Sequence, residues 1–404
     1  MRSFKPEKEH KKEPSAKRAV KNAAVRLAFA FALFMACLAL IWAVKARPSA
    51  AEAYYVPFSV ALAAALGRLT AFTEYSVSEL VVFLILFICL MGLAASAFLL
   101  VRGMIKGIIV RTTLSQEDLK TALVRVFCAA AWIIAGCSVL FFWFTAAWGL
   151  NYYTPGLKDR LGIEPGRYSA QDLYDTVILI TGRLNALAPE VPRGSDGVGD
   201  FGGFERLSGM ASDGFAALAR DYPTFRAAYP KPKRVVNWEF MSRLGISGIY
   251  SPFLGECNVN TDSDDASLPF IISHEMSHRL AVAPEAEANF TAFLACLYSP
   301  YSEYRYSGYF MAFIYCYNAL SASGAAQGDL YAVFSGLDRR VTADISSHDY
   351  RLKKYEGKTR DFGERINDTY LKSLGQAEGV KSYGLVVDLI IAYLENDRLS
   401  AGKH

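Results

Sequence analysis

Two histidines with a glutamate between them are the residues whose types and spacing most directly predict chemistry in this chain. His274, Glu275 and His278 form the pattern HExxH. On an α-helix, a step of four residues places both imidazoles on one face, where their nitrogens can bind one metal ion. The carboxylate that follows the first histidine then lies beside the open coordination position, as a general base for a metal-bound water. The pattern predicts a zinc site with Glu275 as the catalytic residue.

A catalytic zinc site needs a third protein ligand besides the two histidines. The metzincin pattern HExxHxxGxxH fails here, because its Gly position is Ala281 and its third His position is Pro284. Glu285, Glu287 and Asn289 follow in a segment that predicts a second helix running to about residue 298. Both glutamates are candidates for the third ligand. Acidic residues in a first helical turn can also serve only to complement the helix dipole.

The order of HExxH, a turn and then ExxAN resembles the gluzincin arrangement of zinc peptidases. The resemblance implies that Glu285 is the third ligand of the zinc ion. It also implies that Asn289, four residues later on the same helix face, supports a ligand histidine. The seven-residue step from His278 to Glu285 requires the first helix to end soon after His278 and the second to turn back as a tight hairpin.

Residues 233–262 alternate β-branched and aromatic residues with Gly and Pro, which predicts short strands directly before the HExxH helix. In zinc peptidases an edge strand commonly lies beside the metal and pairs with an extended peptide. We expect residues 255–260 to be that strand, with Gly255, Glu256, Asn258 and Asn260 as substrate-binding residues. The alternative is an ordinary short sheet that packs on the helix.

The composition predicts a membrane portion, because 52% of the 404 residues are hydrophobic. Apolar runs at about 27–45, 80–101 and 126–150 can each cross a bilayer as a helix. The first run could instead be a cleaved signal peptide, but the two further spans favour a retained anchor. Residues 57–72 are apolar but short and broken by Gly67 and Arg68, which favours an interfacial helix over a fourth span.

Basic residues in the short flanks predict the orientation in the membrane. Residues 1–22 form a basic tail that we expect to be disordered, and the loop between the second and third spans is also basic. Both are therefore expected in the cytoplasm. Three crossings of the membrane region 23–150 then place a domain of residues 151–404 outside the cytoplasm. A basic tail directly before a span favours this topology signal over a nucleic-acid arm, so we expect no nucleic-acid partner.

Within the last 250 residues or so, several segments predict local structure. Ser169 with Asp172 three residues later predicts a helix to about residue 187, and a second helix is expected near 212–221. The largely apolar run 383–393 is too short to span a membrane and predicts a buried core helix. His348 is expected in a solvated loop. The seven cysteines contain no CxxC and no short paired spacing, which excludes a zinc ribbon or a disulfide framework.

Three sequence blocks together with the three spans resemble an uncharacterised bacterial family of three-span membrane proteins with an external HExxH domain of unknown function. The blocks are GISGIYSPFLGECNVN, LPFIISHEMSHRLAVAPEAEANFTAFLACL and SYGLVVDLIIAY. The resemblance implies a zincin-like peptidase and names no substrate. It also leads us to expect glycine in relatives where this chain has Ala281.

These observations predict a multi-pass α-helical anchor in a bacterial cell membrane, followed by a mainly α, α+β zincin-like domain with a small sheet beside the HExxH helix. The expected activity is Zn²⁺-dependent hydrolysis of peptide bonds in a peptide or protein substrate. Two alternatives remain. One is a zinc-containing membrane sensor or scaffold without catalysis, and the other is a zinc hydrolase acting on a non-peptide amide of the cell envelope.

Overall fold

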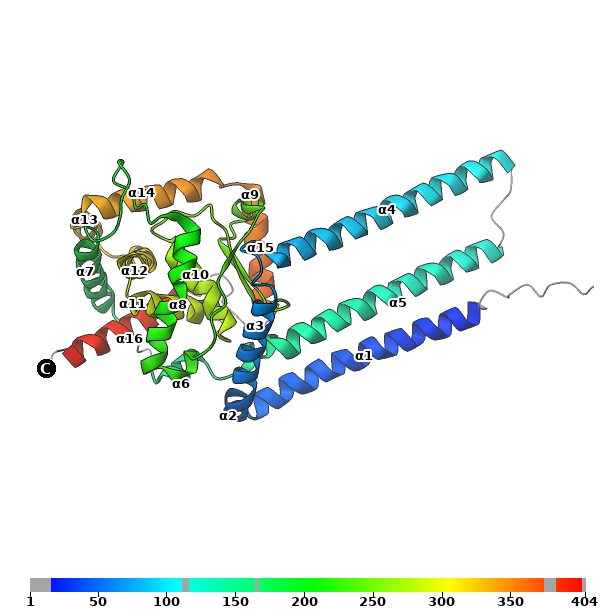
Figure 1. Cartoon of the computed structure of the whole chain (residues 1–404), viewed down its shortest axis with the longest axis horizontal. Coiled ribbons are helices and arrows are strands. Elements are labelled where there is room, and N and C mark those ends of the chain that lie inside the picture. Colours follow the sequence, from blue (N-terminus) through cyan, green and yellow to red (C-terminus); the bar gives the residue numbers. More distant parts are fainter. Residues whose placement is uncertain (1–15, 111–115, 164–165, 167, 374–382, 402–404) are drawn as a thin grey trace, which may run out of the picture. The chain divides into compact units, whose positions relative to one another are not determined.

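The chain divides into two compact units in the computed structural model, which describes residues 16–110, 116–163, 166, 168–373 and 383–401 (Figure 1). The first unit comprises Met1–Ala43 and Phe83–Ala146, and the second comprises Val44–Val82 and Ala147–His404. The second unit thus contains the segment 44–82 in addition to the domain predicted from residue 151 onward.

Long apolar helices account for the predicted spans. They are α1 (Ala16–Ala46), α4 (Val77–Val110) and α5 (Gln116–Ala147). Because α1 begins at Ala16, residues 16–22 continue the span as a helix instead of forming a disordered tail; residues 1–15 lie outside the described part. Alanine, lysine and arginine are good helix formers, so a helix nucleated by the apolar run extends through them.

The third span ends earlier than predicted. Helix α5 stops at Ala147, and a 3-10 helix, η2 (Gly149–Tyr153), follows it. Trp148 and Leu150 are buried inside the second unit. An apolar run facing lipid and one facing a protein core have the same composition, so hydropathy alone could not separate them.

By length and composition, four of the described helices could cross a membrane, and the additional one is Pro48–Leu69. It consists of α2 (Pro48–Ala50), a π-helix η1 (Ala51–Tyr55) and α3 (Val56–Leu69). This helix packs within the second unit. A Cβ atom on Gly67 would lie 2.8 Å from the carbonyl oxygen of Gly255, and the Ser59 hydroxyl donates to the Ala147 carbonyl at 2.9 Å.

The second unit is mainly helical. Its remaining helices are α6 (Leu157–Leu161), α7 (Ala170–Leu187), α8 (Gly203–Asp221), η3 (Pro223–Phe225), α9 (Trp238–Arg243), α10 (Leu268–Arg279), α11 (Glu285–Leu297), α12 (Ser302–Ala322), α13 (Gln327–Ser335), α14 (Arg339–Lys354), α15 (Lys358–Ser373) and α16 (Tyr383–Ala401). The capping box of Ser169 and Asp172 begins α7 as predicted. Helix α8 begins nine residues before the predicted residue 212. The buried side chains of α16 confirm the predicted core helix.

A three-stranded sheet precedes the HExxH helix, as the sequence predicted. Its strands are β1 (Lys233–Arg234), β2 (Gly248–Ser251) and β3 (Glu256–Val259), in the spatial order β1-β3-β2. Strand β3 is parallel to β1 and antiparallel to β2. The prediction that residues 255–260 form an edge strand is therefore wrong, because both sides of β3 are paired. The edge strand beside the HExxH helix is β2.

A buried ion pair explains why β3 is central. The Lys233 ammonium donates to Glu256 Oε1 at 2.7 Å, and Glu256 Oε2 accepts from both the backbone N–H and the hydroxyl of Ser78, at 2.8 and 2.7 Å. Because buried charges need such partners, Glu256 ties β1 and β3 to the first turn of α4.

The other predicted substrate-binding residues also face the interior. Gly255 has a φ of +63°, and a Cβ atom there would lie 2.1 Å from the Ala63 carbonyl oxygen, so only glycine fits against α3. Asn258 and Asn260 are buried. The Asn260 amide donates to the Ser242 hydroxyl at 2.8 Å. Gly255 and Asn258 pack inside the protein, whereas Asn260 also lines a cavity at the end of the sheet.

Helix α10 occupies the centre of the second unit. It contacts α8, α11 and α12 as well as β2, β3 and α3. Helices α8 and α11 are in direct backbone contact, since a Cβ atom on Gly214 of α8 would lie 2.3 Å from the Ala295 carbonyl oxygen of α11. The thiol of Cys257 on β3 donates to the Glu275 carbonyl at 3.2 Å. The HExxH helix is thus fixed by helices on one side and by the sheet on the other.

Candidate metal centre

Three donor atoms from α10 and α11 converge on one point. His274 Nε2 lies 3.1 Å from His278 Nε2 and 3.2 Å from Glu285 Oε2, and His278 Nε2 lies 3.7 Å from Glu285 Oε1. Four ligands about 2.0–2.1 Å from a tetrahedral zinc ion lie about 3.3 Å from one another. The distance between the two histidine nitrogens and that from His274 Nε2 to Glu285 Oε2 are close to this edge length, and with one carboxylate oxygen taken from Glu285 all three ligand atoms lie within 4.8 Å of one another. The residues present therefore fit a zinc ion.

The turn between α10 and α11 makes this convergence possible. Helix α10 ends in a Schellman motif, in which the Ala281 N–H donates to the His278 carbonyl at 3.1 Å and the Val282 N–H donates to the Ser277 carbonyl at 3.2 Å. Ala281 occupies the left-handed position of this motif with a φ of +63° and is the one described non-glycine residue with a positive φ. This geometry explains why a glycine is expected there.

The same turn determines which nitrogen of His278 is available to a metal. His278 Nδ1 lies 2.8 Å from the Val282 carbonyl oxygen, so it carries the proton and donates to that oxygen. The lone pair of Nε2 is then directed at the metal position. The indole N–H of Trp148 donates to the His278 carbonyl at 2.9 Å and holds the end of the helix in place.

Charge at the centre favours a cation. Burial would raise the pKa of Glu285, but the charges of His278 and His274 outweigh burial and lower it. Burial would likewise lower the pKa of His274, but the hydrogen bond and charge of Glu285 outweigh it and raise it. Burial lowers the pKa of His278, which favours its neutral, metal-binding form. Glu285 is therefore anionic, and the positive charge beside it comes from His274, whose raised pKa favours its protonated form; a metal ion bound by the three donors would replace that proton.

The side chain of Glu275 on α10 points toward the edge strand β2. Burial raises the pKa of Glu275 to about 8, and its carboxylate accepts from the Tyr250 N–H. A carboxyl group in this range can take up and release a proton near neutral pH. A Cβ atom on Gly248 would lie 2.4 Å from Glu275 Oε1, so the glycine allows β2 to approach the carboxylate. Glu275 Oε2 is buried without a hydrogen-bond partner.

The two remaining candidates from α11 have different positions. Asn289 lies near His274, and the Tyr315 hydroxyl donates to Asn289 Oδ1 at 3.4 Å. Glu287 points away from the donors and lies at the N-terminus of α6, where its carboxylate accepts from the Leu157 N–H. Glu285, and not Glu287, thus joins the two histidines in the structure.

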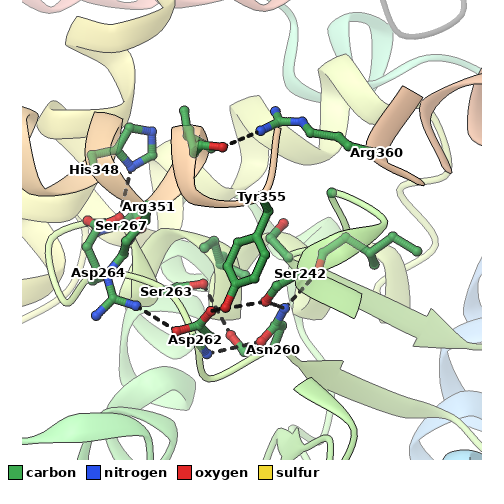
Figure 2. Close-up of a pocket in the computed structure, with 15 residues that line it drawn as sticks. Ser242, Asn260, Asp262, Ser263, Asp264, Ser267, His348, Arg351, Tyr355 and Arg360 are labelled. Atoms are coloured by element: carbon green, nitrogen blue, oxygen red, sulfur yellow. Dashed lines mark hydrogen bonds and ion pairs between the residues drawn. The ribbon is translucent and has the colours of Figure 1, made fainter. Parts of the chain in front are cut away.

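A cavity of about 120 Å³ is lined by residues of α10, of α14 and of the loops before β2 and after β3 (Figure 2). Ser247, which precedes Gly248, and Ile271, one turn before His274 on α10, line it together with Leu352 of α14. At its rim, Asp262 accepts from the Tyr355 hydroxyl at 2.6 Å and from Arg351 at 3.1 Å. The cavity thus lies at the end of the sheet where β2 begins and β3 ends, and neither Glu275 nor the three donor residues line it.

His348 lines the same cavity and was not expected there. It lies in α14 instead of a solvated loop, and its Nδ1 atom is 2.8 Å from Asp264 Oδ2. Sequence reasoning also missed Trp148, which no local pattern distinguishes from the preceding span. The isolated glycine at 248 in a β-rich segment is a signal for close backbone approach and could have been found.

A model of the family described as "Protein of unknown function (DUF3810)" matches residues 54–391 of the chain. No curated protein and no solved structure matches significantly. The matched range includes residues 54–76 before α4, the sheet and the three converging donor residues.

Substitutions at Ala281 should test the turn. Replacement by glycine removes a left-handed strain of about 1–2 kcal/mol for a non-glycine residue, against about 0.5–1 kcal/mol of added chain entropy. Ala281→Gly is thus expected to leave the protein equally or slightly more stable. Ala281→Val should lower the unfolding midpoint and weaken metal binding, because a β-branched residue disfavours this backbone. Equal midpoints for the valine and glycine variants, measured by thermal unfolding, would contradict the assigned role.

The Asp264–His348 pair predicts a pH dependence of stability. Burial would raise the pKa of Asp264, but His348 outweighs it and lowers the pKa below its ordinary value of 3.8. Burial would lower the pKa of His348, but Asp264 raises it above 6.5. The aspartate contribution is present above pH 3.8 and is lost as pH falls through the lowered value. The histidine contribution is complete below pH 6.5 and is lost as pH rises through the raised value.

Wild-type protein should therefore exceed a His348→Gln variant in stability most clearly between about pH 4 and 6.5. The difference should shrink at alkaline pH, and unfolding midpoints measured across this range provide the test. A stability difference between wild type and His348→Gln that stays constant from pH 5 to pH 9 would contradict a raised pKa of His348 caused by Asp264.

Proposed function

The chain belongs to this family of unknown function, and from that premise we propose that it is a membrane-anchored zinc metallopeptidase of the gluzincin type. The observation that carries the proposal is the convergence of His274 Nε2, His278 Nε2 and a Glu285 carboxylate oxygen within 4.8 Å of one another, with the Glu275 carboxyl close enough to His274 and Glu285 to feel their charges. A purely structural zinc site is normally closed by four protein ligands and has no use for a neighbouring base.

Each residue has a distinct role in the proposed reaction. His274, His278 and Glu285 would hold the zinc ion, which when bound supplies a Lewis acid that acidifies water and polarises a carbonyl. Glu275 would accept the proton of the water that attacks the peptide carbonyl. As the C–N bond breaks, Glu275 would return that proton to the leaving amine, so that no net proton is gained or lost.

Accessibility supports catalysis at this position. The side chain of Glu285 is 31% exposed and that of His274 is 15% exposed, whereas His278 is buried at 8%. Solvent thus reaches the side of the centre formed by His274 and Glu285, where an open coordination position is required. The buried His278 is held on the opposite side by Val282 and Trp148.

The sheet supports a peptide as substrate. Strand β2 is at the edge of the sheet and lies against Glu275 through Gly248, so an extended peptide can add to its outer side through main-chain hydrogen bonds. The cavity lined by Ser247, Ile271 and Leu352 can then take a side chain of that peptide. This replaces residues 255–260 as the proposed substrate strand.

The proposed topology has three crossings, by α1, α4 and α5. Helix α3 packs on β3 and α10 of the second unit, which supports an interfacial position over a fourth crossing. With the basic N-terminal flank in the cytoplasm, the second unit would lie outside the bacterial cell membrane. Its substrates would be peptides or proteins of the cell envelope.

Metal analysis with peptide cleavage tests the reaction. Full-length protein purified in detergent should contain one zinc ion and cleave members of a peptide library. Glu275→Gln should keep the zinc and lose about 10²–10⁴-fold in cleavage rate, because only the base is removed. His274→Ala should lose both zinc and cleavage.

Other outcomes identify the alternatives. Stoichiometric zinc with no cleavage of peptides by the wild type would favour a sensor or scaffold, and cleavage restricted to envelope polymer amides would favour the non-peptide hydrolase. A wild-type protein that binds no zinc would eliminate all three functions. Glu287→Gln is the matched control, since Glu287 lies outside the centre and its replacement should leave zinc content unchanged.

Gly248→Ala tests the contact between the edge strand and the base. The added methyl group would overlap the Glu275 carboxylate, so either β2 or Glu275 must move. Zinc content should remain at wild-type level while the cleavage rate falls at least tenfold. Gly182→Ala, where a Cβ atom would meet open space in α7, is the control and should keep full activity. Full activity in Gly248→Ala would show that the contact between β2 and Glu275 is not needed for catalysis.

A further inference from the structure

Large apolar side chains gather on three neighbouring segments of the second unit and remain exposed. The segments are the loop after α3, the region of α9, and α15. Phe72 is 80% exposed, Phe240 is 54% exposed and Phe362 is 57% exposed. The complete set, which we call the apolar face, is Leu69, Phe72, Val236, Trp238, Phe240, Phe362 and Ile366. Exposed aromatic groups in such number mark an interaction surface.

Contacts between the segments show that they are neighbours. Arg234 forms an ion pair with Glu74, and the Arg234 N–H donates to the Glu74 carbonyl at 3.0 Å, which places the loop after α3 beside the strand that leads to α9. At the other end of α9, a Cβ atom on Gly363 would lie 2.3 Å from the Leu244 carbonyl oxygen. Helix α15 therefore crosses directly against the end of α9, as Figure 1 also shows.

The start of α4 relates this face to a bilayer. Residues 77–82 belong to the second unit, and Leu80 and Val82 are exposed at the beginning of an apolar stretch, Val77–Ala95, with a mean hydropathy of 2.6. In the proposed topology α4 crosses the membrane, which puts the bilayer surface within about one helical turn, roughly 5 Å, of Glu79.

Glu79 also holds the residues before α9 close to this proposed bilayer surface. Its carboxylate accepts from the backbone N–H groups of Val236 and Asn237, at 2.6 and 2.7 Å, and thereby holds the two residues that precede α9. Trp238 and Phe240 follow within one turn. Tryptophan is enriched at the headgroup level of membranes, where its ring contacts acyl chains and its N–H contacts water.

We propose that the apolar face rests on the lipid bilayer that α4 enters, with Trp238, Phe240 and Phe362 in the headgroup layer. The occupant is lipid and not a second copy of the chain, because the face is tied by Glu79 to the first turn of a helix that itself enters lipid. The second unit is thereby held in one orientation on the membrane surface. This inference does not depend on zinc binding or on peptide hydrolysis.

Spin-label accessibility tests the contact in full-length protein. Cys37, Cys89, Cys128 and Cys137 are replaced by alanine, and a label is placed at residue 240, 362 or 72 in nanodiscs of phosphatidylethanolamine and phosphatidylglycerol. Labels at Tyr331 of α13 and Ile178 of α7, which are exposed on other elements, are the controls. The parent without an added cysteine corrects for labelling of the buried cysteines.

Collision with apolar oxygen relative to a water-soluble nickel chelate should be several-fold higher at residues 240, 362 and 72 than at the controls. Ratios equal to the controls would overturn the proposal. Labels protected from both reagents would also overturn it and would identify a protein partner as the cover. Matching unfolding midpoints for labelled variants and parent exclude a folding defect, and three separate positions keep the test decisive if one variant fails to fold.

Discussion

The hydrogen bond from His278 to the Val282 carbonyl is the interaction on which the candidate site depends. It exists only because Ala281 adopts a left-handed backbone and turns the chain back within six residues. The same turn starts α11 at Glu285, so the carboxylate lies at a helix N-terminus, where the dipole favours negative charge. Glu285 can therefore complement the dipole of α11 and act as a metal ligand in the same position.

Burial of charge around α10 requires support from distant parts of the chain. Trp148 holds the carbonyl end of the helix, Cys257 bonds a carbonyl in its middle, and Gly248 allows the sheet to approach its acidic side chain. These residues come from three separate stretches of sequence. These contacts match part of the polar surface of a buried helix that carries two histidines and a glutamate, while Glu275 Oε2 has no hydrogen-bond partner among the described residues.

Periodicity and spacing predicted the parts of the site that are local in sequence. The four-residue step of HExxH brings the two histidines together by helix geometry. The choice of Glu285 over Glu287 as the third donor came from the resemblance to gluzincins, and the turn after α10 brings Glu285 to the histidines in the structure. Strand order could not be predicted in the same way. Residues 255–260 alternate like an edge strand, but the ion pair of Glu256 with Lys233 and the approach of Gly255 to α3 make β3 central.

Segments that join the second unit from the membrane region were hidden for a related reason. Pro48–Leu69 is long and apolar enough to cross a membrane, although its mean hydropathy of 1.2 is below the 2.2–2.6 of the other three candidate helices. Its packing, like that of Trp148 and Leu150, is shown only by partners far along the chain. The donors of α10 and α11 needed no such partner to be identified. What sequence alone could not supply was the packing around them.

The contact between Ser78 and Glu256 joins residues 178 positions apart and so fixes an order of assembly. At about 5–20 residues per second, synthesis separates the two by roughly 10–40 s. During that interval the beginning of α4 and all of α3 have been made, but the sheet that they pack against has not. The long apolar helices are thus synthesised before the two histidines. The centre can form only after the N-terminal segments that support it have been made. A fragment that starts after α5 would lack the α3 and α4 surfaces that β3 packs against.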